Sequence, residues 1–314
     1  MKALVAGGAG FIGSHLCDAL LEEGHGVVCV DDLSRGKKEN IQKLEENSSF
    51  HFYRSDISKM DMLKQIFEQE KPEYIFHLAA NSDIQASAKN PEIEYRSTYS
   101  TTFNLLQCMK IYGVKKIFFA STSAVYGDRM GAELKEDMSG LSPVSYYGAA
   151  KLGSEALISA YSYMENLQAL VFRFPNVVGP GLTHGVIYDF IRKLRSNPTQ
   201  LEILGDGTQT KPYIYVEDLI QAILFMKEAQ KSGVLLYNLG VDGCTSVTQI
   251  ADILCEEMEL KNVKYLYTGG KVGWKGDVPK FQYCLDKIHS TGWRARYTSN
   301  EAVRMTVKHE LGKM

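Results

Sequence analysis

Residues 3–13 of this 314-residue chain read ALVAGGAGFIG, a short apolar run followed by glycines at positions 7, 10 and 13. The run predicts a β-strand, and the residues that follow predict a helix over 13–23. A GxxGxxG spacing between a strand and a helix lets the backbone turn tightly and approach a pyrophosphate, whose charge then faces the helix N-terminus. The stretch therefore predicts a unit that binds a dinucleotide.

The alternation of strand and helix continues to about residue 175. Further strands are predicted by β-rich runs at 27–30, 50–54, 74–78, 116–120 and 169–174, and further helices by periodic patterns at 59–69, 92–112 and 146–163. This order predicts an α/β fold with a doubly wound, Rossmann-type parallel sheet.

The pattern loosens after Asn176, where Gly, Pro and Thr gather in NVVGPGLTHG. A helix is predicted over 186–196, and the remainder contains KYLYTGG and a late helix around SNEAVRMTVKHE. We expect a nucleotide-binding domain over 1–175 and a smaller C-terminal α+β lobe over 176–314. The predicted strand and helix at about 212–230 would rejoin the first sheet.

The composition argues against several kinds of binding partner. Lys and Arg number 35 against 37 Asp and Glu, so the net charge of −2 provides no basic field for nucleic acid or an anionic membrane. The six cysteines form no CxxC pair, which predicts reduced thiols in a cytoplasmic protein. The N-terminus lacks the apolar core of a signal peptide, and no run of about eighteen apolar residues predicts a membrane span. The seven histidines form no HxH or HxxxH, so no metal site is predicted.

Two acidic residues follow predicted strands. Asp31 comes eighteen residues after Gly13, where a carboxylate accepts hydrogen bonds from a ribose 2′-hydroxyl and repels a 2′-phosphate, so NAD is favoured over NADP. Arg35 and Lys37-Lys38 lie close enough to tolerate that phosphate, and Asp31 as a simple turn residue stays open. Asp56-Ile57 are placed to meet the adenine, with a turn residue or helix N-cap as the alternative for Asp56.

A candidate base comes from the helix that begins near residue 146. Tyr147 and Lys151 are four residues apart and therefore share one helix face. A phenol with a reference pKa of ~10 becomes a base at neutral pH only if roughly 4 kcal/mol of preferential stabilisation favours its anion. Lys151 and a positively charged nicotinamide would supply that field. A chance pair is the alternative, but here the pair follows a nucleotide motif and a strand-end hydroxyl, Thr122.

Several segments together resemble the extended short-chain dehydrogenase/reductase family, specifically its nucleotide-sugar epimerases and dehydratases. They are GGAGFIGSH at 7–15, FHLAA at 76–80, STSAVYGD at 121–128, YYGAAK at 146–151, RFPNVVGP at 173–180 and LGDGTQTKPYIYVEDL at 204–219. The resemblance spans nearly the whole chain. It implies a Rossmann domain with tightly held NAD, a C-terminal lobe that binds a nucleoside diphosphate sugar, and a homodimer built on helices of the first domain.

The resemblance also implies roles for individual residues. Tyr147 would be the catalytic base, Lys151 its partner and Thr122 the hydroxyl that binds the reacting sugar oxygen. The implied cofactor contacts are Gly7, Gly10, Phe11, Ile12, Gly13, Asp31, Asp32, Ser34, Arg35, Asp56, Ile57, Leu78, Ala79, Ala80, Thr98, Ser121, Tyr147, Lys151 and Pro175. The implied substrate contacts are Ser82, Thr122, Ser123, Asn176, Gly185, Val186, Lys211, Tyr213, Trp274 and Asp277.

Three positions depart from the family pattern. Thr98 stands where the family usually has an asparagine, and Lys211 stands where it has a bidentate arginine. Trp274 replaces an arginine three residues before Asp277, so a diphosphate contact would pass to another cation. The candidates are Lys275, Lys271, Arg192 and Arg195. Trp274 would stack on a base or sugar, or pack under a loop.

The pair after Thr122 separates the reactions of the family. In the first step that the resemblance implies, Tyr147 takes a proton from a sugar hydroxyl, usually at C4, while hydride passes to NAD⁺ and leaves a 4-ketose. Dehydratases then need a second acid/base pair directly after the threonine, whereas this chain has Ser123-Ala124. Asp83, Glu133 and Glu136 are the nearby acids that would have to replace it.

We therefore predict an NAD-dependent nucleotide-sugar epimerase that oxidises and re-reduces C4. The alternatives are a 4-dehydrogenase that releases the 4-keto sugar, a 4,6-dehydratase, and a sensor that binds NAD without chemistry. Such a sensor typically loses the Tyr/Lys pair, which this chain keeps.

Overall fold

The computed structural model describes residues 1–81, 83–229, 232–270, 272–273 and 276–313. They form two compact units: the first comprises 1–125, 145–173 and 220–237, and the second comprises 126–144, 174–219 and 238–314. The main division, after Arg173, lies close to the boundary expected near 175. One segment differs from that expectation, because 126–144 belongs to the second unit. The segment 220–237 lies in the first unit and overlaps the stretch of about 212–230 that was expected to rejoin it.

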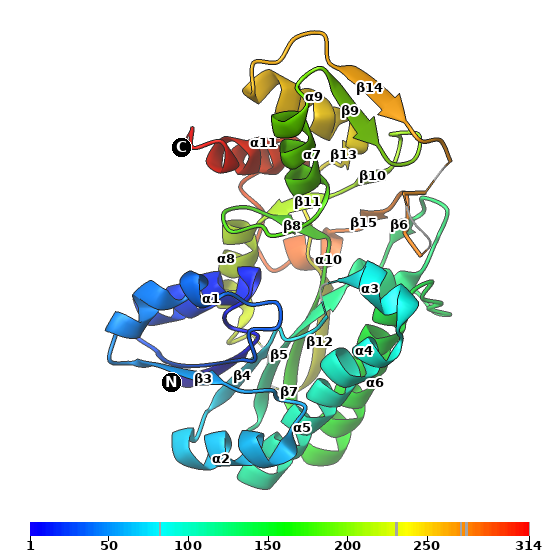
Figure 1. The fold of residues 1–314 in the computed structure, drawn as a ribbon. Coiled ribbons are helices and arrows are strands. Elements are labelled where there is room, and N and C mark those ends of the chain that lie inside the picture. Colours follow the sequence, from blue (N-terminus) through cyan, green and yellow to red (C-terminus); the bar gives the residue numbers. More distant parts are fainter. Residues whose placement is uncertain (82, 230–231, 271, 274–275, 314) are drawn as a thin grey trace. The chain divides into compact units, whose positions relative to one another are not determined.

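A seven-stranded sheet forms the centre of the first unit (Figure 1). Its spatial order is β12-β7-β5-β4-β1-β2-β3, and the neighbours from β5 to β3 pair in parallel. The strands are β1 Lys2–Ala6, β2 Gly26–Asp31, β3 Phe50–Arg54, β4 Tyr74–His77, β5 Lys116–Thr122, β7 Gln168–Phe174 and β12 Gly233–Asn238. The chain order reverses between β1 and β4, and open α/β sheets bind ligands at the carboxyl ends of the strands at such a point.

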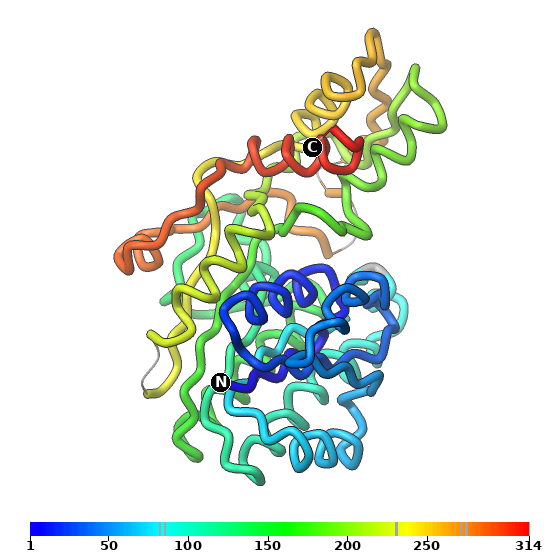
Figure 2. Tube along the Cα trace, turned by 90° about the vertical axis from the view of Figure 1, so that its left-hand side faces the viewer, coloured from blue at the N-terminus to red at the C-terminus, as the bar shows by residue number. Residues whose placement is uncertain are grey.

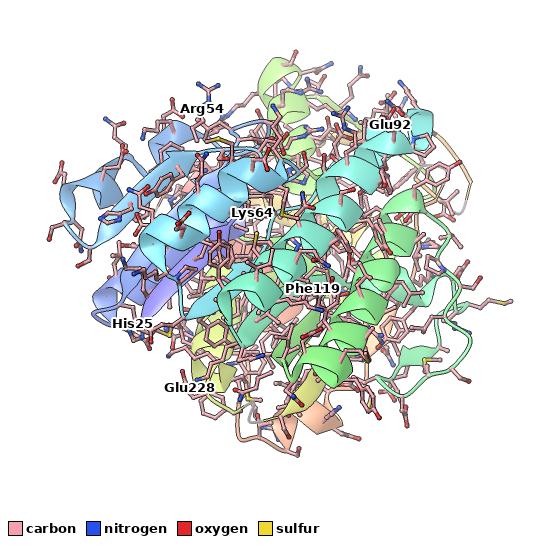
Figure 3. The ribbon with its side chains drawn as sticks, turned by 90° about the horizontal axis from the view of Figure 1, so that it is seen from below. His25, Arg54, Lys64, Glu92, Phe119 and Glu228 are labelled. Atoms are coloured by element: carbon pink, nitrogen blue, oxygen red, sulfur yellow. The ribbon has the colours of Figure 1, made fainter. Side chains whose placement is uncertain are left out.

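Helices cover both faces of this sheet. On one face lie α2 Met60–Glu70, α5 Thr101–Tyr112 and α6 Tyr146–Glu165, side by side (Figure 3). Buried Leu63, Ile66 and Phe67 repeat at helical spacing along α2 and pack into the same apolar core as Ile75 and Phe119 of the sheet. On the other face lies α1 Phe11–Glu22 (Figure 1). The observed helices and sheet confirm the predicted α/β fold class.

One predicted connection is wrong. The strand at Tyr213–Tyr215, β11, does not rejoin the seven-stranded sheet but pairs with β8, Asn176–Val178. The strand that joins the sheet is β12, beside β7, which the sequence pattern did not reveal. Between them runs α8, Val216–Met226, whose end is fixed in the first unit by an ion pair of 2.8 Å from Lys227 to Glu23.

The helix predicted over 92–112 has three sections. It begins as α4 Glu92–Glu94, continues as a π-helical stretch η3 at Tyr95–Ser100 and becomes α5. The hydroxyls of Thr101 and Thr102, at the start of α5, donate to the carbonyl of Thr98 in the π-helical stretch at 3.0 and 2.9 Å. Such π stretches occur frequently at functional sites.

Shorter elements complete the first unit. They are η1 Lys38–Asn40, η2 Gln42–Glu46 and α3 Ile84–Lys89, and η4 at Ser123–Tyr126 follows β5.

The second unit is an α+β structure with four two-stranded sheets. Its strands are β6 Glu133–Leu134, β8, β9 Gln200–Ile203, β10 Thr210–Lys211, β11, β13 Thr245–Ser246, β14 Lys264–Tyr267 and β15 Gln282–Tyr283. Its helices are α7 Val186–Ser196, α9 Val247–Glu257, α10 Asp286–His289 and α11 Ser299–Glu310. The apolar faces of α7, α9 and α11 pack together with β9 and β11 into one core (Figure 2).

Candidate active site

The loop between β1 and α1 passes so close to its neighbours that side chains do not fit. Gly7 has φ +82°, and a Cβ there would lie 2.7 Å from the backbone nitrogen of Ala79. A Cβ on Gly13 would lie 2.1 Å from the carbonyl oxygen of Gly7. Both positions therefore require glycine, which explains their spacing in the sequence.

The N-terminus of α1 is open to an anion. Gly10 occupies the N-cap position, and no side chain caps the first turn. Backbone hydrogen bonds fix the loop, from Gly7 N–H to Val30 at 2.8 Å and from Lys37 N–H to Ala9 at 3.0 Å. A fixed helix N-terminus with free N–H groups suits a pyrophosphate, so the loop fits the dinucleotide that the motif predicts.

Asp31 connects this loop to the end of β2. The side chain is 8% exposed, and its carboxylate accepts hydrogen bonds from the backbone N–H groups of Ala9 at 3.0 Å and Leu33 at 2.9 Å. Burial raises the pKa of Asp31, while these two hydrogen bonds act in the opposite direction. A carboxylate has about four acceptor positions. Asp31 can therefore hold the loop and still accept a ribose hydroxyl.

Arg35 contacts a carboxylate within the protein. Its Nη2 lies 2.7 Å from Oδ2 of Asp83, which also caps α3 by accepting the Ala86 N–H. A guanidinium paired in this way is a poorer partner for a 2′-phosphate than a free one. Asp83, one of the acids considered as a proton acceptor for elimination, is therefore bound to Arg35. The remaining predicted cofactor residues in the first turn of α1 and after β2 are partly or fully exposed: Phe11, Ile12, Asp32 and Ser34.

Asp56 is a turn residue in the structure. Its Oδ1 accepts the N–H of Ser58 at 2.9 Å, and α2 begins only at Met60 with Lys59 at the N-cap position. The alternative of Asp56 as the N-cap is therefore wrong. Asn104 of α5 fixes this turn by donating to the carbonyl of Ile57 at 3.1 Å.

The segment Leu78-Ala79-Ala80 directly follows β4 and is partly exposed. Ala79 is the residue that a side chain at Gly7 would strike. The predicted cofactor residues of 7–13 and 78–80 are therefore neighbours in space.

The first turn of α6 carries the candidate base. Ser145 caps the helix, because its hydroxyl accepts the N–H of Gly148 at 3.1 Å, and this cap fixes the helix start at Tyr146. Tyr147 follows in the first turn, and its phenol is hydrogen-bonded to Thr122 at the end of β5. The structure thus brings the predicted base and the predicted hydroxyl into direct contact.

Lys151 lies one turn further along α6. Its side chain is 2% exposed, its Nζ donates to the carbonyl of Ala120 at 2.7 Å, and Nζ lies 5.9 Å from the ring centre of Tyr147. Burial raises the pKa of Tyr147 well above its ordinary value, and burial lowers the pKa of Lys151 to about 8. A buried phenol loses its proton near neutral pH only beside positive charge, and Lys151 supplies such a charge.

Sequence reasoning missed two carboxylates near this pair, one partly buried and one buried. Glu155 accepts hydrogen bonds from Arg173 at 3.0 and 2.7 Å and from the hydroxyl of Ser121. Glu94 is the second. The hydroxyl of Ser121 therefore donates to Glu155, and its oxygen and the backbone of Ser121 are left for the predicted cofactor contact. The spacing of four between Lys151 and Glu155 is the sequence signal that could have revealed Glu155.

Position 124 carries no acid. The N–H of Ala124 donates to Oγ1 of Thr122 at 3.2 Å, so the backbone after β5 curls around the threonine hydroxyl. The methyl group of Ala124 stands at the position where a dehydratase would have its carboxylate. Of the other acids considered, Glu136 accepts the Asn238 N–H at 2.8 Å in the second unit, and Glu133 is exposed in β6.

Four predicted substrate residues come together within the second unit. Asn176 in β8 stands opposite Tyr213 in β11, and their side chains are hydrogen-bonded. Lys211 forms an ion pair with Asp277 at 2.5 Å. Burial raises the pKa of Tyr213 to about 12, and the charge of Asp277 contributes to the rise. The cation that replaces the family's arginine is therefore already paired.

The other predicted substrate residues are placed as follows. Gly185, with φ +99°, is the N-cap of α7, and Val186 begins that helix without a side-chain cap. Ser123 is partly exposed, and Pro175 is buried between β7 and β8. Ser82 and Trp274 lie outside the described residues, as do the candidate cations Lys271 and Lys275. The other two candidates point to partners of their own, Arg192 to Asp189 and Arg195 to the carbonyl of Glu310.

Among the residues that the structure describes, no three His, Cys, Asp or Glu side chains are grouped so that they could hold a metal ion. Within the same residues, every helix is too short or too polar to cross a bilayer.

A model of the NAD dependent epimerase/dehydratase family matches residues 3–240. The chain belongs to this family. A UDP-glucuronate 4-epimerase from Thermodesulfobacterium geofontis is 33% identical over 97% of this chain and 94% of that protein. The solved UDP-glucose 4-epimerase of Thermotoga maritima with UDP-glucose is 33% identical, with a TM-score of 0.90 over 99% of both chains.

A second solved structure adds the cofactor. The UDP-glucuronic acid 4-epimerase of Bacillus cereus, in complex with UDP-glucuronic acid and NAD, is 28% identical with a TM-score of 0.89 over 100% of both chains. Together these findings confirm the predicted family, the predicted NAD cofactor and the predicted activity: this chain is an NAD-dependent nucleotide-sugar epimerase.

Proposed function

We propose that this epimerase interconverts the C4 epimers of a UDP-sugar. UDP is favoured because the relatives named above are 4-epimerases of UDP-glucose or UDP-glucuronate. The observation that carries the proposal is the hydrogen bond of Tyr147 to Thr122, with Nζ of Lys151 5.9 Å from the Tyr147 ring centre and an alanine at position 124.

The roles follow from this geometry. Thr122 hydrogen-bonds the C4 oxygen of the sugar, and Tyr147 takes the proton of the C4 hydroxyl. Lys151 stabilises the phenolate through its buried ammonium group. The glycine-rich loop and Asp31 would hold NAD, whose nicotinamide would serve as hydride acceptor and donor for C4. On the return step, Tyr147 gives its proton back to the C4 oxygen, which leaves the enzyme as it started.

Ala124 determines what happens to the 4-keto sugar. Loss of water requires a group that removes the C5 proton, and the methyl group at position 124 does not accept one. Reduction at C4 requires a group that binds the C4 oxygen and a group that returns its proton, and Thr122 and Tyr147 supply these. Epimerisation is therefore the outcome that these residues support.

We assign NAD binding to the first unit and the nucleotide part of the sugar substrate to the second. The second unit supplies the group formed by Asn176, Lys211, Tyr213 and Asp277, together with the uncapped start of α7 at Gly185. A helix N-terminus and partly exposed hydrogen-bonding side chains are suited to a diphosphate and its nucleoside.

We further propose a cytoplasmic homodimer that associates through helices of the first unit. Six large apolar or aromatic side chains on α5 and α6 are exposed: Phe103, Ile111, Tyr112, Tyr146, Tyr163 and Met164. Helix surfaces that carry many exposed apolar side chains are typical of interaction sites. The six cysteines are all free, as expected in a reducing compartment.

A ligand panel tests the substrate proposal. The purified enzyme is incubated with UDP-, GDP-, CDP- and dTDP-sugars, and its unfolding temperature and the products are recorded. We expect a UDP-sugar to raise the unfolding temperature most, because ligand that binds only the folded state stabilises it. We also expect NMR to show the C4 epimer of that sugar. Turnover confined to a GDP-, CDP- or dTDP-sugar would contradict the choice of nucleotide.

A further inference from the structure

A buried carboxylate lies on the segment that follows β4. Glu94, at the end of α4, is 2% exposed. One of its oxygens accepts a hydrogen bond from Nδ2 of Asn81 at 2.8 Å, and the other accepts one from the hydroxyl of Thr98 at 2.7 Å. Hydrogen bonds donated to both oxygens hold the Glu94 carboxylate in a fixed place. A buried anion with ordered donors is rarely without a specific role.

The charge of Glu94 acts on the catalytic pair. The π-helical stretch η3 that follows Glu94 packs against α6, where a side chain at Gly153 would come within 3.0 Å of the Tyr99 ring. After burial, the charge of Glu94 is the largest influence on the pKa of Tyr147 and on that of Lys151, and it raises both. A carboxylate at this place therefore opposes the effect of burial on the lysine.

Thr98 serves this carboxylate. The family resemblance places an asparagine at position 98, but here the Thr98 hydroxyl donates to Glu94 and accepts the backbone N–H of Asn81 at 3.3 Å. Asn81 directly follows the segment 78–80 beside the glycine loop. The hydroxyl of Thr98, which was predicted to contact the cofactor, instead takes part in a hydrogen-bond network that joins the end of β4 to Glu94.

We propose that Glu94 is a positioning residue for proton transfer: held by Asn81 and Thr98, its carboxylate keeps the ammonium of Lys151 protonated. The inference rests on the proposed roles of Tyr147 and Lys151. Without this charge, burial would leave Lys151 neutral over more of the working pH range, and the phenolate would lose its stabilising partner.

Other charged groups around the pair have partners of their own. Glu155 also raises the pKa of Lys151, but it is bound in a bidentate ion pair by Arg173. His77 is buried beside Phe119, and burial lowers the pKa of its imidazole, so it adds no positive charge near neutral pH. In the hydrogen bonds described above, both donors to Glu94 are neutral groups. Its negative charge is therefore less compensated than that of Glu155, which is paired with the guanidinium of Arg173.

The test replaces Glu94 by glutamine, with Glu92→Gln as the matched control. Both residues lie on α4, but Glu92 is exposed at its outer end (Figure 3). A negative charge raises the pKa of both Tyr147 and Lys151, so its removal lowers both. We expect both limbs of the pH profile of kcat/KM to move to lower pH, by on the order of one pH unit. Glu92→Gln should leave the profile in place.

A fall in rate with both limbs unmoved would assign Glu94 a purely structural role and overturn the proposal. So would a shift to higher pH. Glu94→Asp keeps the charge and should keep both limbs close to those of the wild type, even if the rate falls. This variant also tests the proposal if glutamine prevents folding, because a shift of about one unit with the charge retained would contradict it.

A second readout requires no substrate. NMR of protein labelled with ¹³C-lysine follows the titration of Lys151, whose signal is assigned by its loss in Lys151→Met. The wild type should titrate near pH 8, and Glu94→Gln should titrate at lower pH. An unchanged midpoint would refute the inference about Glu94, whereas absence of any epimerase activity in the wild type would refute the proposed function instead.

Discussion

The glycine-rich loop and the Tyr147–Lys151 pair lie in the same unit but obtain their properties in opposite ways. The loop acts through backbone shape: Gly7 and Gly13 are required because no Cβ fits, and the exposed N–H groups of α1 provide the charge. The pair acts through side chains whose ionisation depends on burial and on the charges of Glu94 and Glu155. A change in the loop should therefore alter cofactor binding, and a change in the pair should alter proton transfer.

The largest effect should come from Tyr147→Phe. The variant keeps the ring but loses the hydroxyl that exchanges the proton, so turnover should fall on the order of 10²- to 10⁴-fold. Because the loop is unchanged, the purified variant should still carry NAD, as measured by mass analysis of the extracted nucleotide. Near-normal turnover would show that another group is the base.

A smaller effect of a different kind should come from Gly7→Ala. Alanine at this positive φ costs about 1–3 kcal/mol of backbone strain. Its Cβ would also strike Ala79, so the loop must shift. We expect the affinity for NAD, measured by calorimetry, to fall about tenfold or more, since 1.4 kcal/mol corresponds to tenfold.

Gly24→Ala is the control for this variant. Gly24 has a similar φ of +78°, but nothing lies within 4 Å of the added Cβ. It should lower the unfolding temperature through strain alone and leave NAD affinity unchanged. Equal losses of NAD affinity in both variants would show that general destabilisation, rather than the shape of the loop, is responsible.

The same contrast explains what the sequence could reveal. The loop, Asp31, the Tyr147–Lys151 pair and the first six strands of the sheet depend on residues close together in the chain, so spacing alone predicts them. Helix α6 begins one residue before Tyr147 because Ser145 caps it, and the sequence pattern placed that start correctly.

The parts that spacing missed depend on contacts between distant segments. Glu94 reaches its role through Asn81 and Thr98, and the polar residues at 92–102 otherwise look like one surface of a continuous helix. Strand β12 joins the sheet beside β7 although some sixty residues separate them, and β11, nearer in sequence, pairs elsewhere. Pairing partners of short strands are decided by tertiary packing, which local patterns do not encode.

The central claim is that the 4-keto sugar is reduced again in the same site instead of being dehydrated or released. A UDP-sugar deuterated at C4 tests it directly, with the product analysed by mass spectrometry and NMR. We expect the C4 epimer with unchanged mass and with deuterium still on C4. A product lighter by water with solvent hydrogen at C5, or a free 4-keto sugar with deuterium left on the nicotinamide, would contradict the claim.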